Sequence, residues 1–486
     1  MQLTNLIDGI LKTDKNATIS GVTVDSRLVK KGFLFGALPG SKEDGAKYIA
    51  DAIDHGATVL LVHEKAIIPA ISDDIIVLKT SNTRKDFAKI ASKFYKLQPE
   101  NIVAVTGTSG KTSTVSFTQQ LWHLSGITSC ASLGTLGVSG PGIRRYGRLT
   151  TPDSEGLHAE LADLASVGVT HLAMEASSHG LHQYRLDGVH VDVAAYTNLS
   201  RDHLDYHKDM DEYFEAKARL FSEILKNDGT AVINIDDEYA QRLIKICEKR
   251  GVKIITVGHH DADITVKSRM PIPDGQAINI SVYGVDYSLT LPLVGDFQVM
   301  NALCALGLVL AKDNTPEKYV PLLEKLRGVP GRLQLVGDHT KGAVYVDYAH
   351  KPAALETVLK TLRPHTENRL ICVFGCGGNR DAGKRAIMGK IAHDLADIVV
   401  VTDDNPRYEQ AEDIRKEILS SAPDAIEIGD RAKAIEWGVQ NLQQGDVLLV
   451  AGKGHETGQI IADKVLPFDD VEEVEKAIKN LNQGKL

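Results

Sequence analysis

The residues with the clearest chemical potential are Lys111 and Thr112, which follow a short glycine-containing stretch. Residues 103–114 read Val-Ala-Val-Thr-Gly-Thr-Ser-Gly-Lys-Thr-Ser-Thr, so an apolar strand runs into a turn and then into a helix start. Lys111 can reach terminal phosphates, and the Thr112 hydroxyl can hold Mg²⁺. Backbone N–H groups at a helix start attract phosphate oxygens. The pattern predicts an ATP phosphate-binding loop made by Gly107, Thr108, Ser109, Gly110, Lys111 and Thr112.

This stretch departs from the standard phosphate-loop motif at one position. The motif G-x-x-x-x-G-K-[ST] requires glycine where the chain has Val105, so the ordinary NTPase family is not the best fit. A glycine-rich turn without function is the alternative interpretation. We favour a phosphate loop because the strand, the turn, the Lys-Thr pair and the helix occur in the required order.

Polar clusters follow two further apolar strands. Glu175 begins the segment Glu-Ala-Ser-Ser-His-Gly, and His203 and His207 lie in the segment 197–207. The carboxyl ends of parallel strands form the active edge of such sheets. A carboxylate and an imidazole placed there could join Thr112 around Mg²⁺.

Some of these side chains also allow plainer interpretations. His203 and His207 are four residues apart, as on one helix face, and could be an incidental surface pair. Lys217 lies in the helical pattern 215–219 and by itself indicates an exposed lysine. Cys372 and Cys376 could be a metal pair, but no second ligand pair has suitable spacing. The residue pattern alone leaves the histidine and Lys217 alternatives open.

Bulk composition restricts the class of protein. The chain has 486 residues, 43% hydrophobic and 24% charged, which is typical of a globular protein of about three domains. Its net charge of −9 argues against a general nucleic-acid or anionic-membrane surface. No apolar run approaches the ~20 residues that span a bilayer, and no signal peptide is evident at the N-terminus. We expect a cytoplasmic monomer with five free cysteines, no nucleic-acid partner and no membrane insertion.

Alternation of strands and helices predicts an α/β protein with three domains. Residues 1–98 form an N-terminal domain, because Pro99 lies in a polar connector before the phosphate-loop strand. Residues 99–329 form a central domain whose βαβ rhythm predicts a mainly parallel sheet, with an antiparallel extension within 262–293. Residues 330–486 repeat this rhythm and predict a second doubly wound domain.

The ordered motifs along the chain resemble those of the Mur ligases of peptidoglycan synthesis, and among them the members that add diaminopimelate. The matching segments cover nearly the whole chain: 25–27, 34–40, 106–112, 150–152, 175–181, 197–207, 329–332, 347–350, 375–381, 404–407 and 452–456. The resemblance implies an N-terminal UDP-substrate domain, a central P-loop ATPase domain and a C-terminal Rossmann-like amino-acid domain that closes over the site.

The resemblance also implies roles for individual residues. Lys111, Lys217 and His203 would be catalytic, with Lys217 carbamylated by CO₂ so that its cationic amine becomes an anionic oxygen ligand. The metal ligands would be Thr112, Glu175, His203 and carbamylated Lys217. The nucleotide would also contact Asn301, Arg332 and Asp347. The UDP-N-acetylmuramoyl-L-alanyl-D-glutamate substrate would contact Ser26, Thr150, Thr151, Ser177, Gln183 and Arg185.

The identity of the added amino acid depends on residues 404–407, Asp-Asn-Pro-Arg, which resemble the family members that add meso-diaminopimelate. Arg407 can grip the distal carboxylate that diaminopimelate has and L-lysine lacks. A pocket with an unpaired cation can reject such an analogue by roughly 10⁴-fold. The implied pocket is Arg380, Asp404, Asn405, Arg407, Gly452 and Glu456. Without the resemblance, residues 404–407 would only indicate a turn at a strand end.

The activity implied is that of an ATP-dependent acid–amino-acid ligase. ATP would phosphorylate the free D-glutamyl carboxylate, and the neutral amine of diaminopimelate would attack the acyl phosphate. The alternatives are a lysine-adding counterpart, a folylpolyglutamate synthase, and a non-ligase ATPase or nucleotide switch. Ser109, Gln298 and Lys351 depart from common family residues and leave local nucleotide contacts open.

Overall fold

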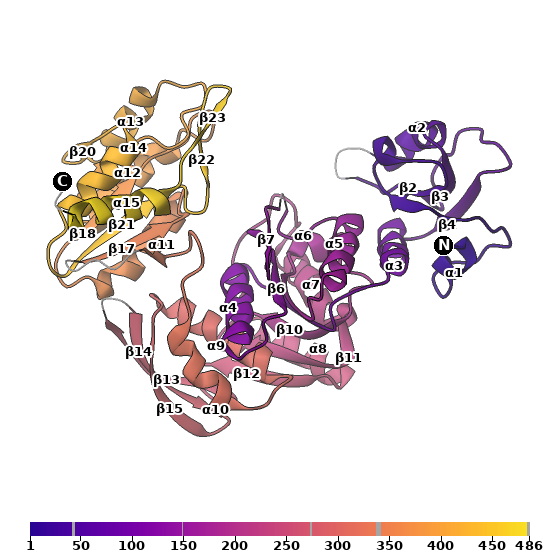
Figure 1. Ribbon diagram of the computed structural model, residues 1–486, viewed down its shortest axis with the longest axis horizontal. Coiled ribbons are helices and arrows are strands. Elements are labelled where there is room, and N and C mark those ends of the chain that lie inside the picture. Colours follow the sequence, from indigo (N-terminus) through magenta and orange to yellow (C-terminus); the bar gives the residue numbers. More distant parts are fainter. Residues whose placement is uncertain (41–43, 148, 273–274, 337–341, 484–486) are drawn as a thin grey trace. The chain divides into compact units, whose positions relative to one another are not determined.

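The structure is a computed structural model that describes residues 1–40, 44–147, 149–272, 275–336 and 342–483. The chain divides into two compact units, and Figure 1 shows the helices and strands along it. The first unit contains residues 1–265 and 301–319, and the second contains residues 266–300 and 320–486. No helix in the described ranges is both long enough and apolar enough to cross a membrane.

The first unit begins with a small sheet of four parallel strands in chain order: β1 (Gly21–Thr23), β2 (Phe33–Gly36), β3 (Ala57–His63) and β4 (Ile76–Thr80). Alternate residues of β3 enter two separate cores, since Val59 and Leu61 face one and Leu60 and Val62 the other. Both faces are therefore covered. The helices here are α1 (Leu3–Ile7), η1 (Ser26–Leu28), η2 (Gly45–Tyr48), α2 (Ile49–Asp54) and α3 (Thr83–Tyr95).

The large sheet of the first unit has the strand order β12-β11-β10-β5-β9-β6-β7-β8. Strands β12 to β6 in that order are parallel, whereas β7 and β8 add an antiparallel edge. The strands are β5 (Asn101–Thr106), β6 (Cys130–Gly134), β7 (Gly137–Gly140), β8 (Ile143–Arg145), β9 (His171–Glu175), β10 (Val191–Tyr196), β11 (Leu225–Asn234) and β12 (Lys253–Gly258).

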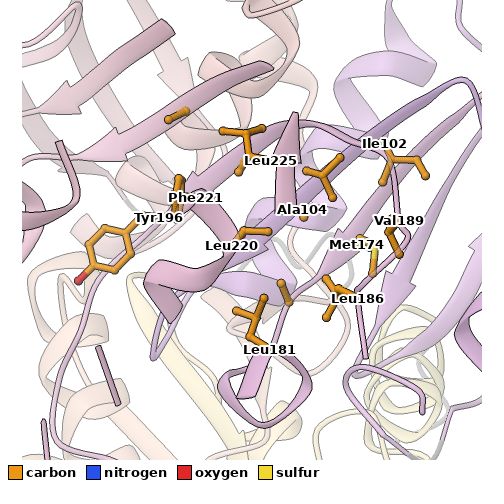
Figure 2. Close-up of a cluster of buried hydrophobic side chains, with 14 of the residues drawn as sticks. Ile102, Ala104, Met174, Leu181, Leu186, Val189, Tyr196, Leu220, Phe221 and Leu225 are labelled. Carbon is orange, nitrogen blue, oxygen red and sulfur yellow. The ribbon is translucent and has the colours of Figure 1, made fainter. Parts of the chain in front are cut away.

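Helices cover this sheet on both faces. Ile102 and Ala104 of β5 enter a core that also contains Leu181, Leu220 and Phe221 (Figure 2), and α4 packs against β5, β6 and β9. The helices are α4 (Lys111–Leu124), α5 (Ser154–Ser166), α6 (Ser178–His182), α7 (Met210–Arg219), η3 (Leu220–Ile224), α8 (Ala240–Arg250) and α10 (Pro316–Tyr319). Helix α9 (Asp296–Leu310) belongs to the first unit from Asn301 onward.

The second unit contains a six-stranded sheet with the order β16-β17-β21-β18-β19-β20, in which only the β16–β17 pair is antiparallel. Cys372 and Phe374 of β18 enter one core, and Ile371 and Val373 enter the opposite core. The sheet is therefore doubly covered. Its strands are β16 (Gln334–Leu335), β17 (Gly342–Asp347), β18 (Leu370–Phe374), β19 (Ile398–Val401), β20 (Ile426–Glu427) and β21 (Asp446–Ala451).

Further elements complete the second unit. Strands β14 and β15 pair antiparallel, as do β22 and β23 in a separate hairpin. Strand β13 (Ile264–Ile272) starts in the first unit, where Ile264 and Thr265 pair parallel with β12. The remaining elements are β14 (Gly275–Val282), β15 (Val285–Leu291), η4 (Val320–Lys325), α11 (Pro352–Leu362), η5 (Arg363–His365), α12 (Lys384–Leu395), α13 (Ala411–Leu419), α14 (Arg431–Gln440), β22 (Gly458–Ile461), β23 (Lys464–Pro467) and α15 (Asp470–Asn482).

The predicted α/β class with parallel sheets is confirmed. The apolar runs at residues 191–196 and 370–374 predict strands, and these are the observed bounds of β10 and β18. The predicted antiparallel extension is present in β14 and β15, although residues 273–274 of that prediction lie outside the described residues. The domain boundaries after residues 98 and 329 remain predictions.

Candidate active site

The predicted phosphate loop connects β5 to α4. Gly107 and Gly110 have φ values of +150° and +86°, a region that side chains rarely adopt. A Cβ on Gly107 would lie 1.9 Å from the Thr197 hydroxyl, and one on Gly110 would lie 2.2 Å from Oδ1 of the buried Asn301. Both positions therefore require glycine, and Asn301, whose nucleotide contact stays a prediction, lies against the loop.

Residues after β10 hold the loop in place. The Thr197 hydroxyl donates to the Ser109 carbonyl over 2.6 Å. The N–H groups of Thr108 and Ser109 donate to Asn198, to its carbonyl over 2.8 Å and to its Oδ1 over 3.0 Å. Two backbone N–H groups of the loop are therefore bonded to Asn198. Helix α4 starts at Lys111, and the positive end of its dipole attracts anions there.

Two lysines converge on one carbonyl of this loop. Lys111 Nζ donates to the Gly107 and Thr108 carbonyls over 2.9 Å each, and Lys217 Nζ donates to the Gly107 carbonyl over 2.8 Å. Lys217 is only 2% exposed, so the interpretation of an exposed helix lysine is wrong. Burial and, less strongly, the charge of Lys111 lower its pKa well below the usual lysine value. A lysine in such surroundings can supply a neutral, nucleophilic amine.

Tyr213 contacts both Lys217 and the loop. It lies one helical turn before Lys217 on α7, and the Lys217 nitrogen is 4.3 Å from its ring centroid. Its hydroxyl lies 3.2 Å from the Thr108 hydroxyl. The aromatic ring leaves the amine little access to water.

Glu175 at the end of β9 lies beside the start of α4. Its Oε1 accepts from the Thr112 hydroxyl over 3.0 Å and from the Thr135 N–H over 2.8 Å, and its Oε2 accepts from the Thr135 hydroxyl over 3.2 Å. These hard oxygen donors suit Mg²⁺. Among the described residues, however, no group of three or more His, Cys, Asp or Glu side chains is arranged to hold a metal. A carbamate on Lys217 would supply a further anionic oxygen, so the donor set fits Mg²⁺ with the modification.

The two histidines of the segment 197–207 are neither helical nor a surface pair. They precede α7 in a turn, where His203 has φ +53° and the His207 N–H donates to the His203 carbonyl over 2.9 Å. His203 is exposed, whereas His207 is 1% exposed. Burial lowers the pKa of His207 to about 4, so this ring is neutral at pH 7.

A cavity of about 230 Å³ lies beside the loop. Many of the predicted site residues line this cavity, although they come from separate parts of the sequence. Tyr213 also lines it. Those that line it are Lys111, Thr150, Thr151, Ser177, Arg185, His203 and Lys217.

Hydrogen bonds connect the residues predicted to bind the UDP-substrate. The Thr151 hydroxyl donates to the Glu175 carbonyl over 2.9 Å and accepts from the Ser177 N–H over 3.0 Å. The Arg185 guanidinium donates to the Thr151 carbonyl over 2.6 Å and to Gln183 Oε1 over 2.8 Å. Ser26, by contrast, is buried in η1 and does not line the cavity.

Arg332 and Asp347, predicted to contact nucleotide, belong to the second unit. Asp347 ends β17, and its carboxylate accepts from the N–H groups of Leu333 and Ala349 over 2.7 and 2.8 Å. Burial raises the pKa of Asp347. The Arg332 guanidinium lies 5.6 Å from the Tyr348 ring centroid.

In the second unit, Asn405 of the predicted amino-acid pocket is hydrogen-bonded to both Glu456 and Arg407. Asn405 Nδ2 donates to Glu456 Oε2 over 3.1 Å, and the Arg407 guanidinium donates to the Gly378 carbonyl over 2.9 Å. Gly452 has φ +121°, and a Cβ there would lie 3.0 Å from Asp404 Oδ2. Arg380 is exposed on the loop after β18. The group combines carboxylates with guanidinium groups, as a site for a zwitterionic ligand requires.

Models of one protein family match most of the chain. The Mur ligase family, catalytic domain matches residues 18–95, the Mur ligase middle domain residues 105–309, and the Mur ligase, glutamate ligase domain residues 331–454. A UDP-N-acetylmuramoyl-L-alanyl-D-glutamate–2,6-diaminopimelate ligase of Agrobacterium fabrum is 49% identical over 469 residues, 96% of this chain and 95% of its own. The chain belongs to the Mur ligase family.

Two further Mur ligases extend this relationship. A ligase with the same printed name from Rhizobium meliloti is 51% identical over 464 residues, 95% of each chain. A solved structure of a UDP-N-acetylmuramoyl-L-alanyl-D-glutamate–2,6-diaminopimelate ligase matches with a TM-score of 0.75 and 34% identity, covering 99% of this chain and all of the other. The predicted family and its fold are confirmed.

Three residues to which the sequence analysis gave no role lie beside the candidate site residues described above. They are Thr135, which bonds Glu175; Asn198, which holds the loop; and Lys453, which is fully buried beside Asn405. Asn198 and Lys453 stand in motifs that carried the family resemblance, so their positions were a usable signal. Thr135 stands in none of those motifs.

Proposed function

We propose that this chain is an ATP-dependent ligase that joins meso-2,6-diaminopimelate to UDP-N-acetylmuramoyl-L-alanyl-D-glutamate in peptidoglycan precursor synthesis. Relatives of that name are about half identical to it over nearly their whole length. The observation that carries the proposal is the convergence of Lys111 and buried Lys217 on the Gly107 carbonyl, beside the Thr112–Glu175 contact. These are the groups that a phosphoryl-transfer site needs.

The first step would be phosphoryl transfer. An oxygen of the free D-glutamyl carboxylate attacks the γ-phosphorus of ATP, the bond to the β,γ-bridging oxygen breaks, and ADP leaves. Lys111 and the α4 N-terminus would stabilise the charge on the phosphate oxygens. Thr112, Glu175, His203 and carbamylated Lys217 would hold Mg²⁺, which would neutralise further phosphate charge.

The second step would form the amide bond. The neutral amine of diaminopimelate attacks the acyl carbon, the tetrahedral intermediate collapses, inorganic phosphate leaves and the nitrogen loses a proton. Thr150, Thr151, Ser177, Gln183 and Arg185 would position the acyl donor beside the loop, and Ser26 its uridine end. The hydrogen bonds that join Thr151, Ser177, Gln183 and Arg185 support this assignment because they fix these side chains before substrate arrives.

Selection of diaminopimelate is assigned to the second unit. Arg407 would pair with the distal carboxylate, while Asp404, Asn405 and Glu456 would receive the distal ammonium, with Arg380 and Gly452 completing the pocket. The Arg407 side chain is already bonded to the Gly378 carbonyl, and the backbone N–H of Arg407 donates to the Ile460 carbonyl over 3.0 Å. L-lysine would leave the guanidinium without its carboxylate.

The test is ATP-dependent phosphate release with the UDP-dipeptide substrate and either meso-diaminopimelate, L-lysine or no amino acid. We expect release that depends on diaminopimelate. Release with lysine alone would replace the proposal with a lysine-adding ligase. Release indifferent to amino acid would favour a non-ligase ATPase. Cytoplasmic location and a monomeric state remain predictions from the sequence.

A further inference from the structure

Lys453 is a fully buried cation that the proposed reaction does not use. It follows β21, and none of its side chain is exposed. Its Nζ donates to Asn405 Oδ1 over 2.8 Å and to the Gly458 carbonyl over 2.7 Å. Two carboxylates lie just beyond hydrogen-bond range, Glu456 Oε2 at 3.6 Å and Asp404 Oδ1 at 3.8 Å. Because these four groups are all acceptors, the site suits an ammonium.

These contacts fix the Asn405 amide in one orientation. Oδ1 accepts from two donors, Lys453 Nζ and the Ile460 N–H over 2.9 Å, while Nδ2 donates to Glu456 Oε2. A flipped amide would direct its NH₂ group at both donors and lose three hydrogen bonds. The second N–H of the Asn405 amide therefore points in a fixed direction. The half-buried Glu456 carboxylate is held in place by the first N–H.

Lys453 also connects the pocket to the hairpin of β22 and β23 through the Gly458 carbonyl. Gly458 begins β22, and Gln459 Nε2 donates to the Asp404 carbonyl over 2.7 Å. The same strand pairs with Arg407, whose carbonyl accepts from the Ala462 N–H over 2.7 Å. Residues 458–462, which Lys453 holds through the Gly458 carbonyl, thus contact both ends of the segment 404–407.

The charges in this group are unequal. Asp404 and Glu456 are two anions beside one cation, Lys453, whereas the nearby buried Arg431 is paired with Asp470 over 2.7 Å. About one negative charge is left for a ligand ammonium. Diaminopimelate and L-lysine both carry a distal ammonium, so this charge alone does not separate them. Lys453 holds the acceptors of that ammonium in place, so a carboxylate on the same carbon would be directed to Arg407, and L-lysine has no such carboxylate.

We propose that Lys453 is a positioning residue that orients Asn405 and Glu456 and thereby selects an amino acid whose distal end carries both an ammonium and a carboxylate. The proposal rests on the proposed function. Because Lys453 is fully buried, it acts through these neighbours and does not touch the substrate.

The test compares Lys453→Met, which keeps length but removes charge and donors, with the exposed control Lys464→Met on β23. We expect Lys453→Met to raise KM for meso-diaminopimelate by about tenfold or more, the effect of losing one hydrogen bond from a charged group. KM for ATP and for the UDP-substrate should stay within about twofold. The ratio of kcat/KM for meso-diaminopimelate to that for L-lysine should fall by about tenfold or more.

A double-mutant cycle separates positioning from general damage. In an Asn405→Ala background, Lys453→Met should add little to the KM for diaminopimelate, because Lys453 acts through Asn405. Additive effects, an unchanged selectivity ratio, or equal increases in all three KM values would overturn the proposal. If Lys453→Met does not fold, the same ratio of kcat/KM for the two amino acids is measured for Lys453→Gln. This variant keeps a donor but has no charge. Failure of the wild-type protein to use diaminopimelate would instead overturn the proposed function.

Discussion

Lys217 is the single residue on which the proposed chemistry depends most. Its amine is buried, lies against the Tyr213 ring and donates to the phosphate loop. Burial and Lys111 lower its pKa, and CO₂ reacts with neutral amines to give a carbamate. A neighbouring cation would then stabilise the carbamate anion.

Lys217→Arg keeps the positive charge but cannot form a carbamate. We expect kcat to fall by about 10²-fold or more, as when one group that stabilises the transition state is removed. The exposed Lys476→Arg is the control. ¹³C NMR with labelled bicarbonate should show a carbamate signal in the wild type that the variant lacks. Substantial residual turnover, or a signal that persists in Lys217→Arg, would refute the assigned role.

Thr135 is predicted to orient the proposed metal ligand Glu175 through two hydrogen bonds. Thr135→Val removes the hydroxyl but keeps the shape and the backbone N–H. We expect the Mg²⁺ concentration for half-maximal activity to rise by about 10- to 100-fold, as for lost partners of metal ligands. Thr135→Ser should retain the wild-type value. An unchanged Mg²⁺ requirement in Thr135→Val would exclude this role.

Among the elements, the turn between β5 and α4 imposes the strictest geometry. Gly110→Ala places a Cβ 2.2 Å from Asn301 Oδ1 at a positive φ. We expect the free energy of unfolding to fall by about 1–3 kcal/mol, with a weakened affinity for ATP. Gly126 offers a matched control, because it has φ +100° but nothing within 4 Å of an added Cβ. Gly126→Ala should therefore destabilise by backbone strain alone and leave ATP binding unchanged, which isothermal titration can measure.

Helices α14 and α15 are joined by a buried ion pair. Arg431 and Asp470 are both fully buried and form two hydrogen bonds of 2.7 Å. Asp470→Asn leaves an uncompensated buried guanidinium, so we expect a loss of about 3–5 kcal/mol in urea unfolding. Disrupting the exposed Lys476–Glu473 pair with Glu473→Gln should cost less than about 1 kcal/mol. Equal losses in the two variants would contradict this account.

The sequence predicted elements better than it predicted their contacts. Strands such as 191–196 were recognisable because continuous apolar runs mark buried parallel strands. The apolar run 231–235 predicts a strand, but β11 starts earlier, at Leu225. The stretch 226–229, Lys-Asn-Asp-Gly, hid this start because it breaks the apolar run, and the pairing with β10 shifts register between Val191 and Val193. Burial of Lys217 was not predictable from its helix, since the loop that covers it lies 110 residues earlier. The burial of Lys453 was not predictable for the same reason.

For the whole molecule, the account combines a nucleotide site in the first unit with an amino-acid pocket in the second. Family models match along the chain from residue 18 to residue 454. The phosphate loop is expected throughout the Mur ligase family, so it does not identify the amino acid that is added. That identity rests on residues 404–407 and their neighbours, whose functional roles are proposals.

The most direct measurement is product mass after incubation with ATP, UDP-N-acetylmuramoyl-L-alanyl-D-glutamate, and equimolar meso-diaminopimelate and L-lysine. Competition in one vessel compares kcat/KM for the two amino acids directly. The account predicts the diaminopimelate tripeptide, with ADP and phosphate formed in equal amounts, and the lysine product lower by roughly 10⁴-fold. A lysine product in comparable amount, or ATP hydrolysis without any new amide, would contradict it.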